Sequence, residues 1–286
     1  MLKTGKMYKD AKIRVGMIDF TNGLIPDYQL ELTGCEKIYG LPAVLNQKLR
    51  EGELDVSPVS SMEYFLNYSD YQILPSLCIR ADSRAATVGV FSSHRPEDWG
   101  GKQIYLTGAS LTSIYLLKLL CRAYYKVEPN FISQLSEDVS RESLDEVLRQ
   151  FDGMLIIGDQ AYHEQQKLQG DVMYYDLASA WRAWTKLPFV FALWIVRINV
   201  VRTRSFEINK IHNEFLNSIQ LGLKNLDKIC DQKSKQWARD QLKEYFQINL
   251  RYDLDAEGIA GLLRFRDELF QHGLIVGKPP LNFFSH

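Results

Sequence analysis

Two stretches decide the fold predicted for this chain: Pro58-Val59-Ser60-Ser61 and Gly108-Ala109-Ser110-Leu111-Thr112-Ser113. Each is a cluster of small hydroxyl residues that follows a strand-like run and opens a segment with helical apolar periodicity. A helix that begins where a strand ends exposes free backbone N–H groups at the carboxyl edge of a sheet, where open α/β sheets bind anions. Two such helix starts predict a ligand with two anionic ends, held between two lobes.

Helix capping alone also accounts for these residues. Ser and Thr are common N-cap residues, and each stabilises a helix by about 1 kcal/mol with no ligand present. For either stretch taken alone, capping and ligand binding are equal alternatives. The occurrence of both stretches in one chain favours a binding site.

The composition is that of a soluble globular protein without an affinity for polyanions. The 286 residues are 46% apolar and 24% charged, the formal net charge is −1, and basic residues alternate with acidic ones. This pattern predicts neither a nucleic-acid partner nor a membrane partner. The N-terminal sequence lacks the apolar core of a secretion signal, and the longest apolar run, Leu187–Val196, is too short to span a bilayer. We therefore expect a cytoplasmic protein.

The common signatures of metal and cofactor chemistry are absent from the sequence. The four cysteines, at positions 35, 78, 121 and 230, have no metal-ligand spacing, so we expect free thiols and no zinc site. The five histidines are scattered. The sequence contains no glycine-rich dinucleotide loop, no Walker A loop and no serine nucleophile elbow.

Strand and helix patterns alternate along the chain until about residue 197, and a helical C-terminal region follows. The continuous apolar run Leu187–Val196 fits a central strand that is buried on both faces. Pauses in the pattern predict two crossings between two α/β lobes, near residues 92–100 and 186–192. Such a two-lobed clamp binds its ligand in the cleft. The predicted lobes are 1–93 with 190–286, and 94–189, and the C-terminal helices are expected at 206–226, 234–246 and 256–272.

Several residues near the predicted cleft have two interpretations. Asp159 follows a buried strand at a helix start, so it either caps the helix or positions a ligand, and the sequence favours neither role. His94, at the first crossing, fits a solvated loop residue better than a ligand contact. Trp181 and Trp184 fit the core better than a wall of the cleft.

Five motifs, in order along the chain, resemble the menaquinone-biosynthesis family of the futalosine route. They are Gly52–Tyr64, Tyr71–Ile79, Ile104–Ser113, Ile156–Ala161 and Tyr175–Trp194. The resemblance runs in register from about residue 13 to residue 197. The chain departs from the family pattern at Gly23, at Thr87, where the family has serine, and at Ala178 and Lys186, where it has glycine.

The resemblance implies a two-lobed, periplasmic-binding-protein-like fold of type II, in agreement with the two-crossing α/β clamp. It also implies a reaction, because the strings Val59–Ser61 and Leu187–Trp194 are typical of the branch that removes water from chorismate. The product of that reaction is 3-[(1-carboxyvinyl)oxy]benzoate. Chorismate is a dicarboxylate, which matches the two helix starts. The alternatives are the sister activity, 1,4-dihydroxy-6-naphthoate synthase, and a non-catalytic binder of a small dicarboxylate.

Site residues follow from this interpretation. Asn22 is expected at the departing hydroxyl or at a carboxylate, and Thr87 and Ser92 are expected to line the hinge side. The carboxylates are expected on Ser60, Ser61, Ser110, Thr112 and Ser113, with Asp159 as a further contact. The base is either Asp159 or a carboxylate of the substrate. No cofactor or metal is expected, because the reaction forms an aromatic ring and needs little machinery. The apolar faces of the C-terminal helices either cover the first lobe or serve a homodimer.

Overall fold

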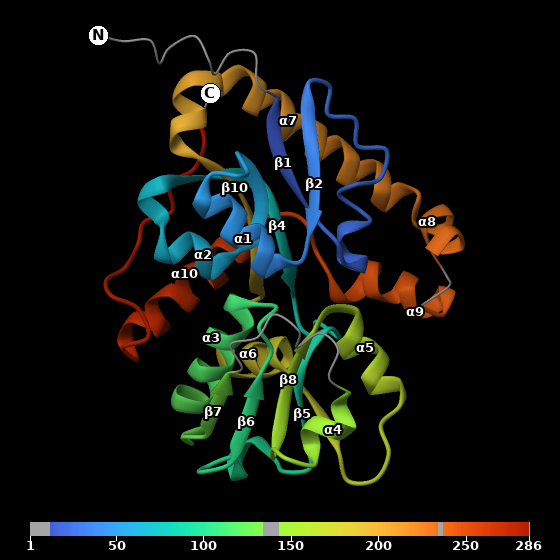
Figure 1. Ribbon diagram of the computed structural model, residues 1–286, viewed down its shortest axis with the longest axis vertical. Helices are drawn as coiled ribbons and strands as arrows, with labels where there is room; N and C mark the ends of the chain where they lie inside the picture. The colour runs from blue at the N-terminus through green and yellow to red at the C-terminus, as the bar shows by residue number, and fades with distance from the viewer. Residues whose placement is uncertain (1–11, 134–142, 234–236, 286) are drawn as a thin grey trace.

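The computed structural model describes residues 12–133, 143–233 and 237–285, and these form two α/β lobes, each built on a five-stranded sheet (Figure 1). The strand order in the first sheet is β2 (Cys35–Gly40), β1 (Ile13–Ile18), β3 (Val56–Ser60), β10 (Phe189–Arg197) and β4 (Tyr71–Ala81). The order in the second sheet is β7 (Asn130–Ser133), β6 (Gln103–Leu106), β8 (Gly153–Ile157), β5 (Val88–Ser92) and β9 (Met173–Asp176). The predicted two-lobed α/β fold is confirmed.

Helices cover the sheets of both lobes (Figure 1). Those of the first lobe are α1 (Pro42–Glu51), α2 (Ser61–Leu66), α7 (Ile198–Lys224) and α10 (Ala256–Gln271). Those of the second lobe are α3 (Leu111–Leu119), α4 (Leu144–Leu148), α5 (Gly158–Gln166) and α6 (Leu177–Thr185). The C-terminal region adds α8 (Leu226–Lys233) and α9 (Arg239–Glu244), and short turns are η1 (Thr21–Gly23), η2 (Tyr68–Asp70), η3 (Pro96–Asp98), η4 (Leu120–Tyr125) and η6 (Tyr245–Asn249). Among the described residues, no helix has the length and apolar character needed to cross a membrane.

Strand β10 is the central strand that the apolar run predicts. It lies between β3 and β4 and runs antiparallel to both, and all but two of its residues are buried. Its register pairs Ala192 with Ser60. The carboxyl end of β3 and the start of α2 therefore lie beside Ala192 of β10. The second crossing, from Thr185 at the end of α6 to Phe189, falls where the sequence predicts it.

The first crossing lies earlier in the chain than the sequence predicts. Strand β5 pairs with β8 and β9 in the second sheet, so the chain crosses between Ala81 and Val88 rather than at 92–100. The pause that suggested the later position is a short 3-10 turn, η3, within the second lobe. An apolar strand fits either sheet equally well, and its pairing partners are not visible in its own sequence. We therefore propose that the second lobe begins at Val88 rather than at residue 94.

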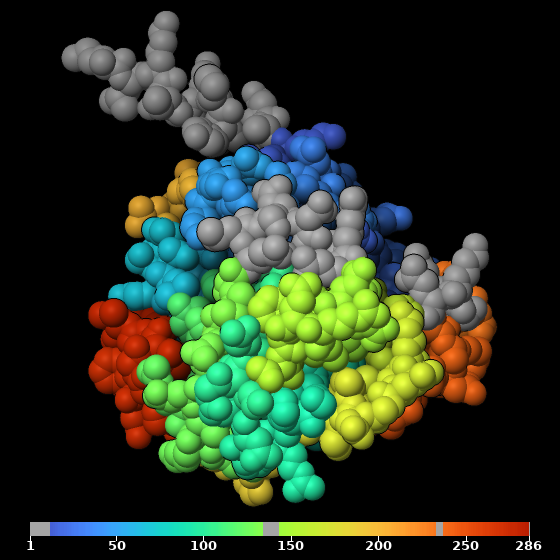
Figure 2. All heavy atoms as spheres, turned by 60° about the horizontal axis from the view of Figure 1, so that its bottom comes forward, coloured from blue at the N-terminus to red at the C-terminus, as the bar shows by residue number. Residues whose placement is uncertain are grey.

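The C-terminal region spans both lobes. Helix α10 agrees with its prediction, whereas α7 begins directly after β10, with a kink at Arg204, and the predicted helix 234–246 begins in residues outside the described part. We call Trp237–Tyr252 the C-terminal segment. It packs on α5 of the second lobe, where the Trp237 ring stacks on Tyr162 with centroids 3.4 Å apart. In Figure 2 the orange C-terminal helices lie beside the yellow part of the second lobe.

Candidate functional site

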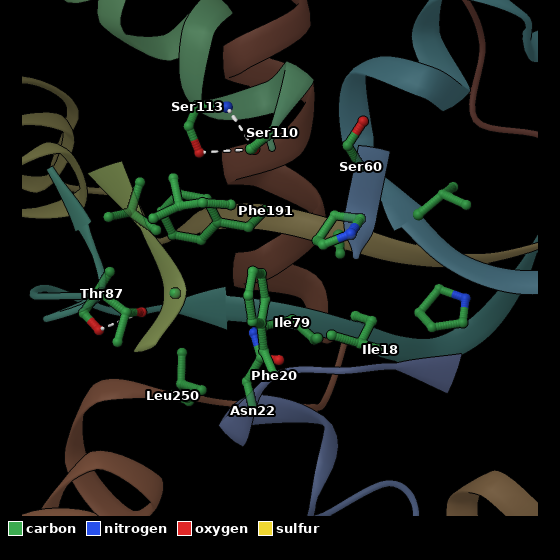
Figure 3. Close-up of a pocket in the computed structure, with 18 of the residues that line it drawn as sticks. Ile18, Phe20, Asn22, Ser60, Ile79, Thr87, Ser110, Ser113, Phe191 and Leu250 are labelled. Carbon is green, nitrogen blue, oxygen red and sulfur yellow. Dashed lines mark hydrogen bonds between the residues drawn. The ribbon is translucent and has the colours of Figure 1, made fainter. Parts of the chain in front are cut away.

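A cavity lies between the two sheets, with residues from both lobes and from the C-terminal segment on its walls (Figure 3). Its empty space, open solvent at the mouth included, is about 620 Å³. No described residue that lines it carries a charged side chain. Its apolar lining includes Ile18, Phe20, Pro42, Ile79, Val88, Ile157, Phe191 and Leu250. Its polar side chains are Asn22, Ser60, Thr87, Ser110, Ser113 and Tyr245.

One wall of the cavity is formed by the starts of α2 and α3, and we call Ser60, Ser110 and Ser113 the helix-start wall (Figure 3). Ser60 caps α2 by accepting a hydrogen bond from the Glu63 N–H at 3.2 Å, and it accepts a second bond from Asn46 Nδ2 at 3.0 Å. Because both acceptor positions of this hydroxyl are used, its proton is the part that can serve a ligand.

Ser110 caps the longer helix α3. Its Oγ accepts a hydrogen bond from the Ser113 N–H at 3.3 Å and lies 2.9 Å from Ser113 Oγ. Two hydroxyls that share one hydrogen bond keep one proton free to donate. The two serines lie at the N-terminus of α3, the positive end of a nine-residue helix. This part of the wall is therefore suited to a carboxylate.

The two helix starts meet each other, contrary to the expectation that they hold opposite ends of one ligand. The Met62 N–H of α2 donates to Thr112 Oγ1 of α3 at 3.1 Å. Thr112 is thus used as a contact between the lobes and is absent from the cavity lining. Because the two starts form one wall, a second anionic or polar end of a ligand has to be bound by other residues.

Asn22 lies on the opposite side of the cavity (Figure 3). Its carboxamide Oδ1 is buried, and no described residue donates a hydrogen bond to it. The η1 turn that carries it is tight, since a Cβ on Gly23 would lie 2.2 Å from the Ile18 carbonyl oxygen. Tyr252 of the C-terminal segment donates to the Asn22 carbonyl oxygen at 2.8 Å. The backbone of Asn22 is therefore held in place, while the side-chain Oδ1 stays available to a ligand.

Thr87 forms a third polar corner together with Tyr245. Thr87 Oγ1 lies 3.2 Å from the Tyr245 hydroxyl and 3.4 Å from the Ala85 carbonyl oxygen. Burial raises the pKa of Tyr245 well above its ordinary value; the Thr87 hydrogen bond opposes this shift, and the negative charge of Asp159 adds to it. The phenol is consequently protonated and neutral across the physiological range.

Two further predicted residues lie away from the cavity. Ser92 was expected on the hinge side with Thr87, but its Oγ donates to the Asp152 carbonyl oxygen at 2.6 Å, at the opposite end of β5. The reason is the earlier crossing, which makes Ser92 the far end of a strand of the second sheet. Ser61 Oγ donates to the Val190 carbonyl oxygen at 2.7 Å and fixes α2 to β10.

Asp159 lies beside the cavity rather than in its lining. It is in the first turn of α5 without capping that helix, and its Oδ2 accepts a hydrogen bond from the Thr21 N–H at 3.2 Å. This contact ties the second lobe to the turn that carries Asn22. Asp159 therefore does not cap α5, and its contact with a ligand stays a prediction, because in this structure the carboxylate binds the backbone next to Asn22.

The sequence prediction missed the contribution of the C-terminal segment. Tyr245 and Leu250 line the cavity, and neither stands in a recognisable motif. Both belong to amphipathic helical patterns, in which an aromatic or leucine side chain is indistinguishable from a core residue. Asn46, which fixes Ser60, was also missed for lack of any local signal.

The fold defines the class of protein. The alkanesulfonate-binding protein SsuA of Xanthomonas axonopodis pv. citri, bound to MOPS, has a TM-score of 0.69 at 12% identity, over 94% of this chain and 96% of that chain. A protein of Archaeoglobus fulgidus has a TM-score of 0.73 at 20% identity, over 94% of this chain and 100% of that chain. This chain therefore has the periplasmic-binding-protein fold.

The sequence then defines the family within that fold. The sequence model of the menaquinone biosynthesis family matches residues 13–271, and the chain belongs to that family. The chorismate dehydratase of Thermus thermophilus is 27% identical over 272 residues, which cover 89% of this chain and 94% of that protein. The resemblance inferred from the five motifs is confirmed.

Proposed function

We propose that this protein dehydrates chorismate to 3-[(1-carboxyvinyl)oxy]benzoate. Membership of the menaquinone biosynthesis family and the similarity to the Thermus enzyme support this activity. The single observation that carries it is the buried Oδ1 of Asn22, to which no described residue donates a hydrogen bond. Asn22 lies opposite the helix-start wall, and none of the described residues that line the cavity between them is charged. An acceptor without a donor, enclosed in this way, calls for a ligand hydroxyl.

The reaction requires that one conformer of chorismate be held while its C4 hydroxyl and C3 proton depart. The helix-start wall binds one carboxylate through the free hydroxyl protons and the N-terminus of α3. Asn22 accepts a hydrogen bond from the C4 hydroxyl and thereby orients it. Fixing one conformer supplies up to roughly 7–11 kcal/mol at the upper end of such effects, and the gain of an aromatic ring drives the elimination.

The proton acceptor in this proposal is one of the substrate's own carboxylates. The side chains that line the cavity offer hydroxyls and a carboxamide rather than a carboxylate or an imidazole. Asp159, the other candidate, is engaged with the Thr21 N–H beside the cavity. Its role is then to hold the Asn22 turn against the second lobe.

The cytoplasmic location expected from the sequence stays a prediction.

The test is an incubation of the purified protein with chorismate, followed by product mass and ultraviolet absorbance. The proposal expects a product lighter by one water, with the spectrum of a substituted benzoate. Thermal stabilisation by chorismate without any product would instead support a non-catalytic binder on the same fold. If chorismate is neither bound nor converted to product, the proposal is refuted, and the search turns to the sister activity, 1,4-dihydroxy-6-naphthoate synthase.

A further inference from the structure

The C-terminal segment brings a buried phenol to the cavity. Tyr245 is 2% exposed and lines the cavity, although it lies far along the chain from the other polar residues there. Its ring lies 4.9 Å from that of Trp237, which in turn stacks on Tyr162 of α5. The position of the Tyr245 hydroxyl is thus fixed by contacts of the segment with the second lobe.

The local backbone explains how Tyr245 reaches this position. Helix α9 ends in the π-helical turn η6, in which the Leu250 N–H donates to the Tyr245 carbonyl oxygen at 3.1 Å. The wide turn brings its two ends, Tyr245 and Leu250, together, and both line the cavity. Single π turns are rare and are frequently found at functional sites. Tyr252, just beyond the turn, holds the Asn22 carbonyl.

Thr87 has one hydroxyl proton and two acceptors within reach, the Tyr245 oxygen at 3.2 Å and the Ala85 carbonyl oxygen at 3.4 Å. When the proton goes to the nearer Tyr245 oxygen, the Tyr245 O–H is free to donate into the cavity. The raised pKa keeps this proton on the phenol, and the negative charge of Asp159 contributes to that shift. A negative field at this corner disfavours a carboxylate. The group that suits it is a neutral hydroxyl oxygen.

We propose that Tyr245 contacts the substrate and donates a hydrogen bond to its C4 hydroxyl oxygen, with Thr87 donating to the tyrosine oxygen. The inference rests on the proposed function, in which that hydroxyl is the leaving group. The C4–O bond breaks with its electron pair on oxygen, and the C3 proton, carried by the substrate carboxylate, completes the water. Tyr245 keeps its own proton throughout. Its hydrogen bond strengthens as negative charge develops on the departing oxygen.

The test compares Tyr245→Phe with Tyr162→Phe as a matched control. Each variant removes one phenol hydroxyl that joins the C-terminal segment to the rest of the protein, since Tyr162 donates to Gln241 Oε1. Of these two tyrosines, only Tyr245 lines the cavity. The two readouts are kcat/KM for chorismate and the Kd of the dehydration product, which lacks the C4 hydroxyl. Thermal unfolding checks that both variants fold.

The proposal expects Tyr245→Phe to lower kcat/KM by about tenfold to a hundredfold, the effect of one hydrogen bond that strengthens in the transition state. The product Kd stays within about twofold of the wild type, and Tyr162→Phe leaves both quantities within the same margin. An unchanged kcat/KM in Tyr245→Phe, or an equal loss of product binding, would overturn the proposal.

A loss in Tyr162→Phe as large as that in Tyr245→Phe would also overturn it, because docking of the segment would then explain both. The wild type separates this result from a failure of the proposed function. A wild type that neither binds nor dehydrates chorismate refutes the function and the tyrosine contact together. If the wild type dehydrates chorismate and Tyr245→Phe has an unchanged kcat/KM, only the tyrosine contact is refuted.

Discussion

The helix-start wall and the C-terminal segment both supply hydroxyls to one cavity, but they do so by different means. Ser60 and Ser110 are placed by capping, a local interaction between a side chain and an N–H three residues later. Tyr245 is placed by docking, through contacts with residues that lie far away in the sequence. The difference teaches that a site built on caps is visible in a sequence, whereas a site built on docked side chains is not.

The largest effect is expected where docking is broken. Trp237→Ala removes the ring that stacks on Tyr162 and lies against Tyr245. Because Trp237 is 3% exposed, we expect a loss of about 3–5 kcal/mol in the free energy of unfolding, together with loss of turnover. Urea unfolding and the product assay measure both quantities.

Phe206→Ala is the control for Trp237→Ala, since that ring is 79% exposed. It should change the unfolding free energy by no more than about 0.5 kcal/mol. If the two variants were equally stable and equally active, the C-terminal segment would not be needed to complete the cavity.

The next effect concerns turnover rather than stability. Asn22→Ala removes the buried acceptor that we assign to the substrate hydroxyl, and we expect kcat/KM for chorismate to fall about a hundredfold or more. The melting temperature should stay close to that of the wild type, because no described residue donates a hydrogen bond to Oδ1. Asn213→Ala, at an exposed site on α7, is the control. Activity near the wild-type level in Asn22→Ala would remove this residue from the mechanism.

A pair of serines separates capping from binding on the helix-start wall. Ser110→Ala and Ser143→Ala each remove an N-cap hydroxyl, and each should lower the free energy of unfolding by about 1 kcal/mol. Only Ser110 lines the cavity, so Ser110→Ala should also weaken product binding by about tenfold. Isothermal titration calorimetry measures the affinity. Equal affinities in the two variants would mean that Ser110 is a cap and nothing more.

The smallest effect concerns the ion pair that holds the N-cap of α10, just beyond the C-terminal segment, on strand β4 of the first sheet. Hydrogen bonding from Arg80 lowers the pKa of Asp255 to about 2. A folded pKa below the unfolded value of about 4 gives stability above pH 4 that is lost as the pH falls towards 2. Water screens the half-exposed carboxylate, so the contribution is at most about 1 kcal/mol.

Asp255→Asn tests this ion pair, because asparagine keeps the cap of α10 but carries no charge. The variant should lose less unfolding free energy than the wild type between pH 5 and pH about 2, as followed by urea unfolding. Parallel pH profiles for the two proteins would show that the ion pair does not stabilise the fold.

The sequence predicted those parts of the molecule that depend on local patterns. The alternating strands and helices, the central strand β10 and the serine caps of α2 and α3 were all foreseen. The first crossing was misplaced, because Val88–Ser92 is an apolar strand that fits either sheet. The separation of the two helix starts was misjudged as well, since the Met62–Thr112 contact depends on how the lobes close.

Tyr245 could not be predicted for a similar reason. Its pattern is that of an amphipathic helix, and its partner Thr87 lies far away in the sequence, in the first crossing between the lobes. Asn22 was singled out by its resemblance to a family motif. That its buried Oδ1 receives no hydrogen bond from the part of the chain described here became visible only in the structure. Long-range docking decides which polar side chains reach the cavity, and periodicity carries no information about docking.

The most direct measurement is a crystal structure of the Asn22→Ala variant with chorismate bound. The account predicts one carboxylate on Ser110 and Ser113, and the C4 hydroxyl oxygen within hydrogen-bonding distance of Tyr245, so that both regions contact one ligand. A ligand bound outside the cavity, or one that contacts the helix-start wall without reaching the C-terminal segment, would contradict it.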